Sequence, residues 1–214
     1  MNLMPLQFML HEQLSRCERA FREALTYDSL TGRIQRRHLM EGALSDAWQA
    51  YCSFARNVAI HSSLGCTTAN GTVHAASVNP STWQRSSYIA IRAAKGHSIN
   101  LAQTNTELWK EPTWGDPGKS VSIITALNPG NARTLISHFA GGLLGPKHCQ
   151  IVRNACAHRN HQTKADVEAL ATHYLASKIT FPSEAMLWRD PHTSDFAFIC
   201  WLDDLRTISE GAIK

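Results

Sequence analysis

The feature that most constrains the fold is a repeat of apolar side chains every three or four residues. The first stripe steps by four, three, four and four positions and is formed by Leu10, Leu14, Cys17, Phe21 and Leu25. The second steps by four, three, four and three and is formed by Leu44, Trp48, Tyr51, Ala55 and Val58. This spacing gathers apolar side chains on one face of an α-helix, which then packs against other helices. The sequence therefore predicts amphipathic helices at about residues 10–25 and 39–60.

Shorter helices are predicted in the second half of the chain. A turn at residues 127–131 begins one of them, and Pro146 suits the first turn of the next. Thr163 resembles the N-cap of a helix at residues 163–177, and residues 194–195 can cap the last one. Short links between such helices favour antiparallel neighbours. We therefore expect a single all-α domain over residues 1–214, built as an antiparallel bundle of five to six helices.

Residues 62–126 do not continue this pattern. They are rich in glycine, proline, serine, threonine and asparagine, and they are too long for a plain connection in a compact domain. We expect a loop-rich insertion between helices, with one short helix at residues 82–95. Its aromatic side chains are Trp83, Tyr88, Trp109 and Trp114. In one interpretation, the insertion forms a lid or a partner surface. In the other, these aromatic side chains simply anchor a long loop. A shorter polar loop is expected at residues 27–37.

The composition of the chain limits the partners, location and cofactors that we expect. The net charge of +4 and the isoelectric point of about 8.8 are compatible with RNA binding but are not diagnostic. No apolar run approaches the length of a membrane helix, and no signal peptide is evident, so we expect no membrane association and a cytoplasmic location. The six cysteines form no C-x-x-C pair and are expected to be reduced. No cofactor or metal is expected, because Cys149, Cys156, His158 and His161 match no common zinc spacing.

One short motif carries chemistry. Arg153 and Asn154 are adjacent, and His158 follows in a segment of small residues at a predicted helix end. On a helix, Asn154 and His158 would share a face, and the long stem of Arg153 could reach the same cleft. Histidine transfers protons near neutral pH, and arginine stabilises charge on phosphate oxygens. Together with the amide, they supply the groups needed to cut a phosphodiester without metal.

The motif Arg153-Asn154-x-x-x-His158 resembles the Arg-x4-His signature of the HEPN domain family, a family of helical proteins. The resemblance covers about ten residues and a compatible helical layout. It implies a metal-independent endoribonuclease, a toxin or phage-defence effector that cleaves RNA through the 2′-hydroxyl to a 2′,3′-cyclic phosphate. It also implies a homodimer and an antitoxin or defence-system partner protein. Arg159, Asn160 and His161 could add substrate contacts, or they could only finish the helix.

Two other interpretations remain open. The chain could be a non-catalytic HEPN-like module that binds a nucleotide or a partner within a larger defence complex. Alternatively, Arg153 could bind a carbonyl or carboxylate and His158 a backbone group, both as structural residues. A second Arg-Asn-x-x-x-His pattern runs from Arg56 to His61. We interpret it as structural, or as an accessory phosphate contact through Arg56.

Overall fold

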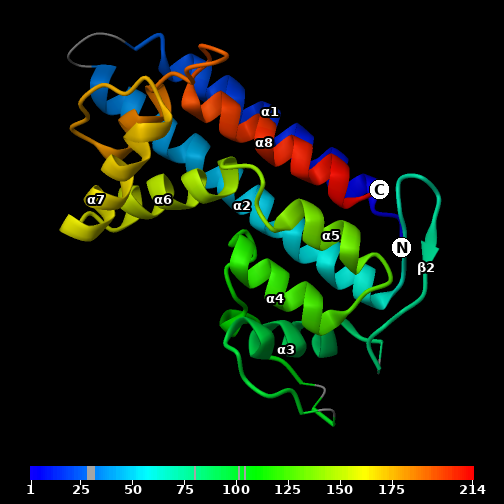
Figure 1. Cartoon of the computed structure of the whole chain (residues 1–214). Helices are drawn as coiled ribbons and strands as arrows, with labels where there is room; N and C mark the ends of the chain where they lie inside the picture. Colours follow the sequence, from blue (N-terminus) through cyan, green and yellow to red (C-terminus); the bar gives the residue numbers. More distant parts are fainter. Residues whose placement is uncertain (28–31, 80, 101, 104) are drawn as a thin grey trace. The chain divides into compact units, whose positions relative to one another are not determined.

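The computed structural model describes residues 1–27, 32–79, 81–100, 102–103 and 105–214, and helices dominate them (Figure 1). The α-helices are α1 (Met4–Ala24), α2 (Gly32–Leu64), α3 (Trp83–Ala94), α4 (Pro117–Leu127), α5 (Ala132–Phe139), α6 (Gly145–Ala157), α7 (His161–Ala169) and α8 (Ala197–Ala212). The 3-10 helices are η1 (Leu108–Lys110), η2 (Leu170–His173) and η3 (Pro182–Leu187). Two short strands, β1 (Cys66–Thr67) and β2 (Val73–His74), pair antiparallel. The predicted all-α class is confirmed.

The chain forms two compact units. The first contains residues 1–10, 51–142 and 207–214, and the second contains residues 11–50 and 143–206. Helices α1, α2 and α8 each contribute residues to both units. Within the described residues, no helix is both long enough and apolar enough to cross a bilayer.

The first unit is built around the second half of α2. Helix α4 packs against α3 and α5, and the rings of Tyr51 and Phe139 lie 6.3 Å apart between their centroids. Helix α4 begins with Asp116, whose carboxylate accepts the backbone N–H of Lys119 at 3.1 Å. It ends at Asn128, which adopts a left-handed conformation with φ of 44°. This left-handed residue ends the helix and turns the chain toward α5.

Both ends of the chain belong to the first unit and meet its hairpin. The backbone N–H of Leu3 donates to the carbonyl of Thr67 at 3.1 Å, and that of Ala69 donates to Ile213 at 2.7 Å. The hairpin therefore exchanges backbone hydrogen bonds with both terminal segments, although it has only two residues in each strand.

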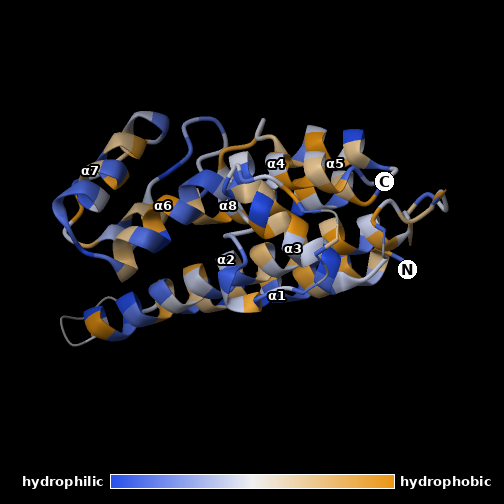
Figure 2. Ribbon diagram, turned by 90° about the horizontal axis from the view of Figure 1, so that it is seen from below, coloured by the Kyte–Doolittle hydropathy of each residue, from blue (hydrophilic) through white to orange (hydrophobic). Residues whose placement is uncertain are grey.

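The second unit buries aromatic side chains of α1 and α8. Phe21 and Phe198 are fully buried, with ring centroids 5.1 Å apart, and Trp201 packs edge-on against Phe198. An ion pair between Arg206 and Glu18, at 3.0 Å, also joins α8 to α1. In Figure 2, α1 and α2 carry both hydrophobic and hydrophilic residues along their length.

Three expectations about the fold need correction. Helix α2 begins at Gly32, so the loop predicted at residues 27–37 is wrong from residue 32 onward, and residues 28–31 lie outside the described part of the chain. Besides the end of α2, residues 62–126 contain α3, η1 and all but the last residue of α4, and neither η1 nor α4 was expected. The described residues therefore hold eight α-helices, more than the five to six predicted.

The helix expected at residues 82–95 is confirmed, and the hydroxyl of Thr82 caps it by accepting the N–H of Arg85 at 3.3 Å. The aromatics of this region behave differently from one another. Trp114 is buried, whereas Trp109 is 80% exposed and cannot anchor a core.

Candidate functional site

The principal motif lies at the C-terminal end of α6. As expected, Pro146 occupies the first turn of this helix. The start of α6 is capped by a side chain from α8, because Asp204 accepts the backbone N–H of Gly145 at 2.8 Å. Burial raises the pKa of the Asp204 carboxyl despite this hydrogen bond. A Cβ atom at Gly145 would lie only 2.6 Å from the Cβ of Asp204, so the close packing of α6 on α8 requires glycine there.

Arg153 and Asn154 lie side by side on the last turns of α6, and both are partly buried. Nη1 of Arg153 donates to the amide oxygen of Asn154 at 3.4 Å, which is a long and weak hydrogen bond. Within the described residues, no carboxylate forms an ion pair with Arg153. Most of the guanidinium donors therefore remain available to an anionic ligand.

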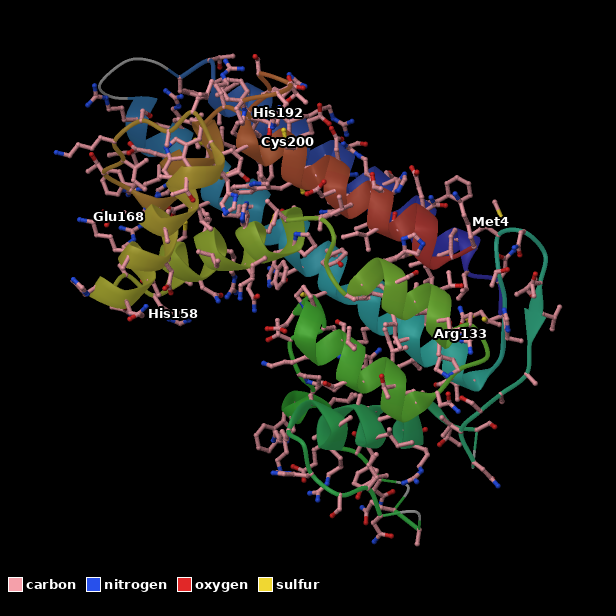
Figure 3. The ribbon with its side chains drawn as sticks, viewed as in Figure 1. Met4, Arg133, His158, Glu168, His192 and Cys200 are labelled. Atoms are coloured by element: carbon pink, nitrogen blue, oxygen red, sulfur yellow. The ribbon has the colours of Figure 1, made fainter. Side chains whose placement is uncertain are left out.

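His158 ends α6 as its C-cap. Its backbone N–H closes the last helical turn by donating to Asn154 at 2.8 Å, but its φ of −128° and ψ of 76° are not helical. The expectation that His158 continues the helical face of Asn154 is therefore wrong for its backbone. The side chain is exposed and leaves from the junction of α6 and α7, where Figure 3 labels it.

Asn160 and Thr163 form the junction that follows. The amide oxygen of Asn160 accepts the N–H of Thr163 at 3.0 Å, and the hydroxyl of Thr163 accepts the N–H of Asn160 at 3.2 Å. This capping box starts α7 at His161, so the N-cap is Asn160 and not Thr163 as predicted. Helix α7 also ends at Ala169 rather than near residue 177. The substrate role of Asn160 stays a prediction, and its side chain already has a structural task.

Arg159 and His161 line a cavity of about 400 Å³ together with Lys164 and Phe181. Arg159 forms an ion pair with Glu41 at 3.1 Å and lies over the ring of Phe181, 5.8 Å from its centroid. Asn160 also lines it, so the structure brings together three of the predicted substrate-contact residues. Lys164 and Phe181 were missed, and Phe181 gave no local signal because it reaches the cavity from the segment that precedes η3.

Arg56 has a different environment in the first unit. Its Nε and Nη2 atoms donate to both oxygens of Glu111, at 2.6 and 2.9 Å. Burial alone would raise the pKa of Glu111, but hydrogen bonds from Arg56, Ser87 and Trp114 outweigh it and hold the pKa below its usual value. Burial, assisted by the positive N-terminus and Arg56, lowers the pKa of His61. These contacts favour the structural interpretation of the second pattern.

A buried polar network supports α6 from within the second unit, and no sequence pattern indicated it. The indole N–H of Trp201 donates to the hydroxyl of Tyr174 at 2.7 Å, and that hydroxyl lies 2.6 Å from Nδ1 of His148. The Tyr174 hydroxyl donates to Nδ1 when the neutral His148 ring carries its proton on Nε2, and accepts from Nδ1 in the other tautomer. Burial, with a smaller contribution from the nearby His173, lowers the pKa of His148 to about 4.

The thiol of Cys156, which lies inside the motif, is not activated as a nucleophile. Burial is the main reason that the pKa of Cys156 rises to about 12, and the charge of Glu41 adds to the effect. The six cysteines are free thiols, and Cys17, Cys66 and Cys149 are buried. Among the described residues, no group of three histidine, cysteine or acidic side chains is arranged to hold a metal ion.

Comparisons with protein-family models, with curated proteins and with solved structures found no match to this chain. The HEPN interpretation therefore depends on the motif residues themselves and on their surroundings.

Proposed function

We propose that this chain is a metal-independent endoribonuclease that uses Arg153, Asn154 and His158. The observation that carries the proposal is the environment of these three residues. Arg153, for which the described part of the chain offers no carboxylate partner, lies beside an amide, and an exposed histidine follows at the helix end. The next residue, Arg159, lines a cationic cavity that suits an RNA phosphate.

In the proposed reaction, the 2′-hydroxyl of a ribose attacks the adjacent phosphorus. The new O2′–P bond forms as the P–O5′ bond breaks, which yields a 2′,3′-cyclic phosphate and a 5′-hydroxyl. His158 either removes the proton from the 2′-hydroxyl or delivers a proton to the leaving O5′. Arg153 holds the phosphate oxygens and stabilises their developing charge, while Asn154 positions its neighbours.

The proposal includes a two-fold homodimer in which the motifs of two copies meet. One motif supplies one imidazole, whereas proton removal and proton delivery benefit from separate groups. The exposure of His158 leaves it accessible to a second copy. A monomer that still cleaves RNA at micromolar concentration would contradict this part of the proposal.

The resemblance also supports a biological role as a toxin or phage-defence effector, held in check by an antitoxin or another partner protein. This role rests on analogy with the HEPN family and not on a feature of the site. It places the protein in the cytoplasm, where its RNA substrate would be found.

The test is a cleavage assay with purified protein and mixed RNA, in the presence and absence of a chelator. We expect cleavage that the chelator leaves unchanged, because every proposed group belongs to the chain itself. We also expect products with 2′,3′-cyclic phosphate and 5′-hydroxyl ends. Cleavage that requires an added divalent ion, or products with 5′-phosphate ends, would contradict the proposal.

A second candidate is the non-catalytic HEPN-like module that binds a nucleotide or a partner protein. The structural contacts of the residues after His158 favour this candidate, because Arg159 forms an ion pair with Glu41 and Asn160 caps α7. Such a module would bind RNA or nucleotide without cutting it. Measurable binding by a protein that leaves every RNA intact would favour this candidate.

A further inference from the structure

The second unit contains a second cationic cavity, whose walls share residues with the cavity beside Arg159. It has a volume of about 440 Å³, and Arg33, Arg36, Arg37 and Lys178 contribute its cationic side chains. Both cavities share Thr180 and Phe181 in their walls. We call the two cavities together the Phe181 groove.

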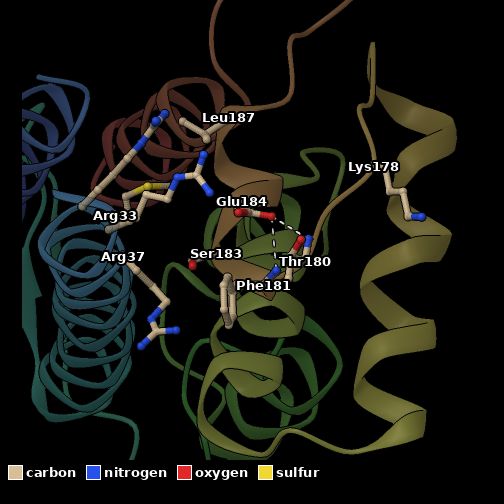
Figure 4. A pocket seen from close by; sticks show the side chains of 10 residues that line it. Arg33, Arg37, Lys178, Thr180, Phe181, Ser183, Glu184 and Leu187 are labelled. Carbon is tan, nitrogen blue, oxygen red and sulfur yellow. Dashed lines mark hydrogen bonds between the residues drawn. The ribbon is translucent and has the colours of Figure 1, made fainter. Parts of the chain in front are cut away.

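The first turns of α2 concentrate positive charge on this groove. Arg33 lies three residues before Arg36 and four before Arg37, the spacings at which like charges on a helix repel each other. Figure 4 shows Arg33 and Arg37 extending from α2, with Lys178 on the opposite side. An anion bound between them would relieve the repulsion and satisfy their donors.

The carboxylate in this cavity does little to neutralise these charges. Glu184 accepts the backbone N–H groups of Thr180 and Phe181 at 2.6 and 3.2 Å, which fixes it at the start of η3 (Figure 4). The cavity therefore presents four cationic side chains against one carboxylate that already holds the local backbone. Nε of Arg36 is buried without a hydrogen bond among the described residues.

Phe181 and Glu41 fix two arginines at the boundary between the cavities. The guanidinium of Arg37 lies 4.6 Å from the Phe181 centroid, and that of Arg159 lies 5.8 Å from it. Glu41 approaches both, at 3.9 Å from Arg37 and 3.1 Å from Arg159. These contacts hold the two cations in place before a ligand arrives, which lowers the entropy cost of binding.

Cations spread over two cavities that share Phe181 match a ligand that carries charges at intervals along a chain. We propose that the Phe181 groove binds the phosphodiester backbone of single-stranded RNA and leads it to His158. Guanidinium planes also accept stacked bases, so the same arginines suit both parts of a nucleotide. Arg159 follows His158 directly in the chain, so a strand that leaves the groove there reaches the motif. This inference rests on the proposed function, because it assigns the binding surface for that substrate.

The test measures binding apart from cleavage. The probe is a labelled 2′-O-methyl oligoribonucleotide of about ten nucleotides, which lacks the attacking hydroxyl. Its binding is followed by fluorescence anisotropy at several salt concentrations. The groove variant is Arg33→Ala/Arg36→Ala/Lys178→Ala, and a milder variant, Arg33→Ala/Lys178→Ala, changes only exposed side chains. The control Arg19→Ala/Lys95→Ala/Lys119→Ala removes the same charge from exposed positions outside the groove.

We expect the groove variant to bind at least about tenfold more weakly, and the slope of log affinity against log salt to fall by about two, since each single-strand phosphate contact contributes about 0.7. The control should change affinity by no more than about twofold, and His158→Ala should bind like the parent. Equal losses in the groove variant and the control would overturn the inference, as would full competition by polyglutamate at equal charge, which would indicate an acidic protein partner.

The two proposals fail in different ways. If no RNA is cleaved but probe binding depends on the groove, the groove is an RNA-binding site and the proposed catalysis is wrong. If His158-dependent cleavage is found while the groove variants bind and cleave like the parent, the catalytic proposal stands and the groove inference is wrong.

Discussion

The two Arg-Asn-x-x-x-His patterns share the geometry of their arginine–asparagine pair and differ in their surroundings. In each, Nη1 of the arginine lies 3.4 Å from the amide oxygen of the following asparagine. Arg56 is bound by both oxygens of Glu111, which is only 10% exposed, whereas Arg153 has no such partner among the described residues. His61 lies within the last turns of α2 and is partly buried, whereas His158 ends α6 and is exposed.

The comparison teaches that a helix-end motif acquires its role from the segment that packs on it. A buried carboxylate turns the arginine into a structural ion pair, because leaving either charge alone in the interior is costly. Without that carboxylate, the same arginine keeps its donors for a ligand. Four predictions would break or sharpen this contrast.

The largest expected effect is on RNA cleavage. His158→Ala should lower the rate by about 10²–10⁴, since it removes a positioned acid–base group, while His61→Ala should retain substantial activity. Initial rates on a labelled RNA would measure both effects, and unchanged melting temperatures would show that folding is intact. An inactive His61→Ala beside an active His158→Ala would mean that the catalytic assignment belongs to the other motif.

The next effect is on the free energy of unfolding. Here the larger loss is expected in the pattern that contains Arg56, not in the one that contains Arg153. Arg56→Ala should cost roughly 3 kcal/mol of unfolding free energy, because it strands the carboxylate of Glu111 in a largely buried site. Arg153→Ala should cost less than about 1 kcal/mol, because it breaks only a long hydrogen bond. Urea denaturation would measure both.

The double variant Arg56→Ala/Glu111→Gln serves as the control for this contrast. It removes the stranded charge and should recover part of the stability lost in Arg56→Ala. An Arg153→Ala variant as unstable as Arg56→Ala would show that both arginines are structural.

Acid should weaken the helix that carries the principal motif. The pKa of His148 lies near 4 in the folded protein against an ordinary value of 6.5, so folding favours the neutral ring. The stabilisation is complete above about pH 6.5 and is lost as the pH falls toward 4, by about 2–3 kcal/mol at pH 4.5.

Urea unfolding between pH 7.5 and 4.5 would measure this loss. His148→Gln keeps an acceptor for Tyr174 without titrating, and it should flatten the dependence. If His148→Gln lost as much stability at acid pH as the parent, the effect would belong to other titratable groups.

The smallest effect concerns the residue inside the motif. Cys156 occupies the position that Ala59 has in the second pattern, and burial raises its pKa to about 12. Cys156→Ala should leave the cleavage rate within about twofold of the parent, and the native thiol should react slowly with thiol reagents at neutral pH. A large loss of rate would place the thiol in the chemistry.

Sequence patterns predicted the helical class because apolar periodicity is a local property of the chain. They also located α3, the start of α5 and the helix that ends at His158. They missed α4 because a mostly apolar run such as residues 121–127 has no amphipathic period. They placed the cap of α7 at Thr163 because Asn160 and Thr163 share the capping box, and either can begin a helix.

The sequence by itself determined that this protein is helical and that two arginine–asparagine–histidine patterns end helices. Only the tertiary structure decided which pattern is buried in an ion pair, because Glu111 lies 55 residues from Arg56 in the chain. It also decided that Phe181 and Glu41 hold Arg37 and Arg159 in place between two cavities. Ion pairs and cation–π contacts depend on distances between distant segments, and no local spacing encodes those distances.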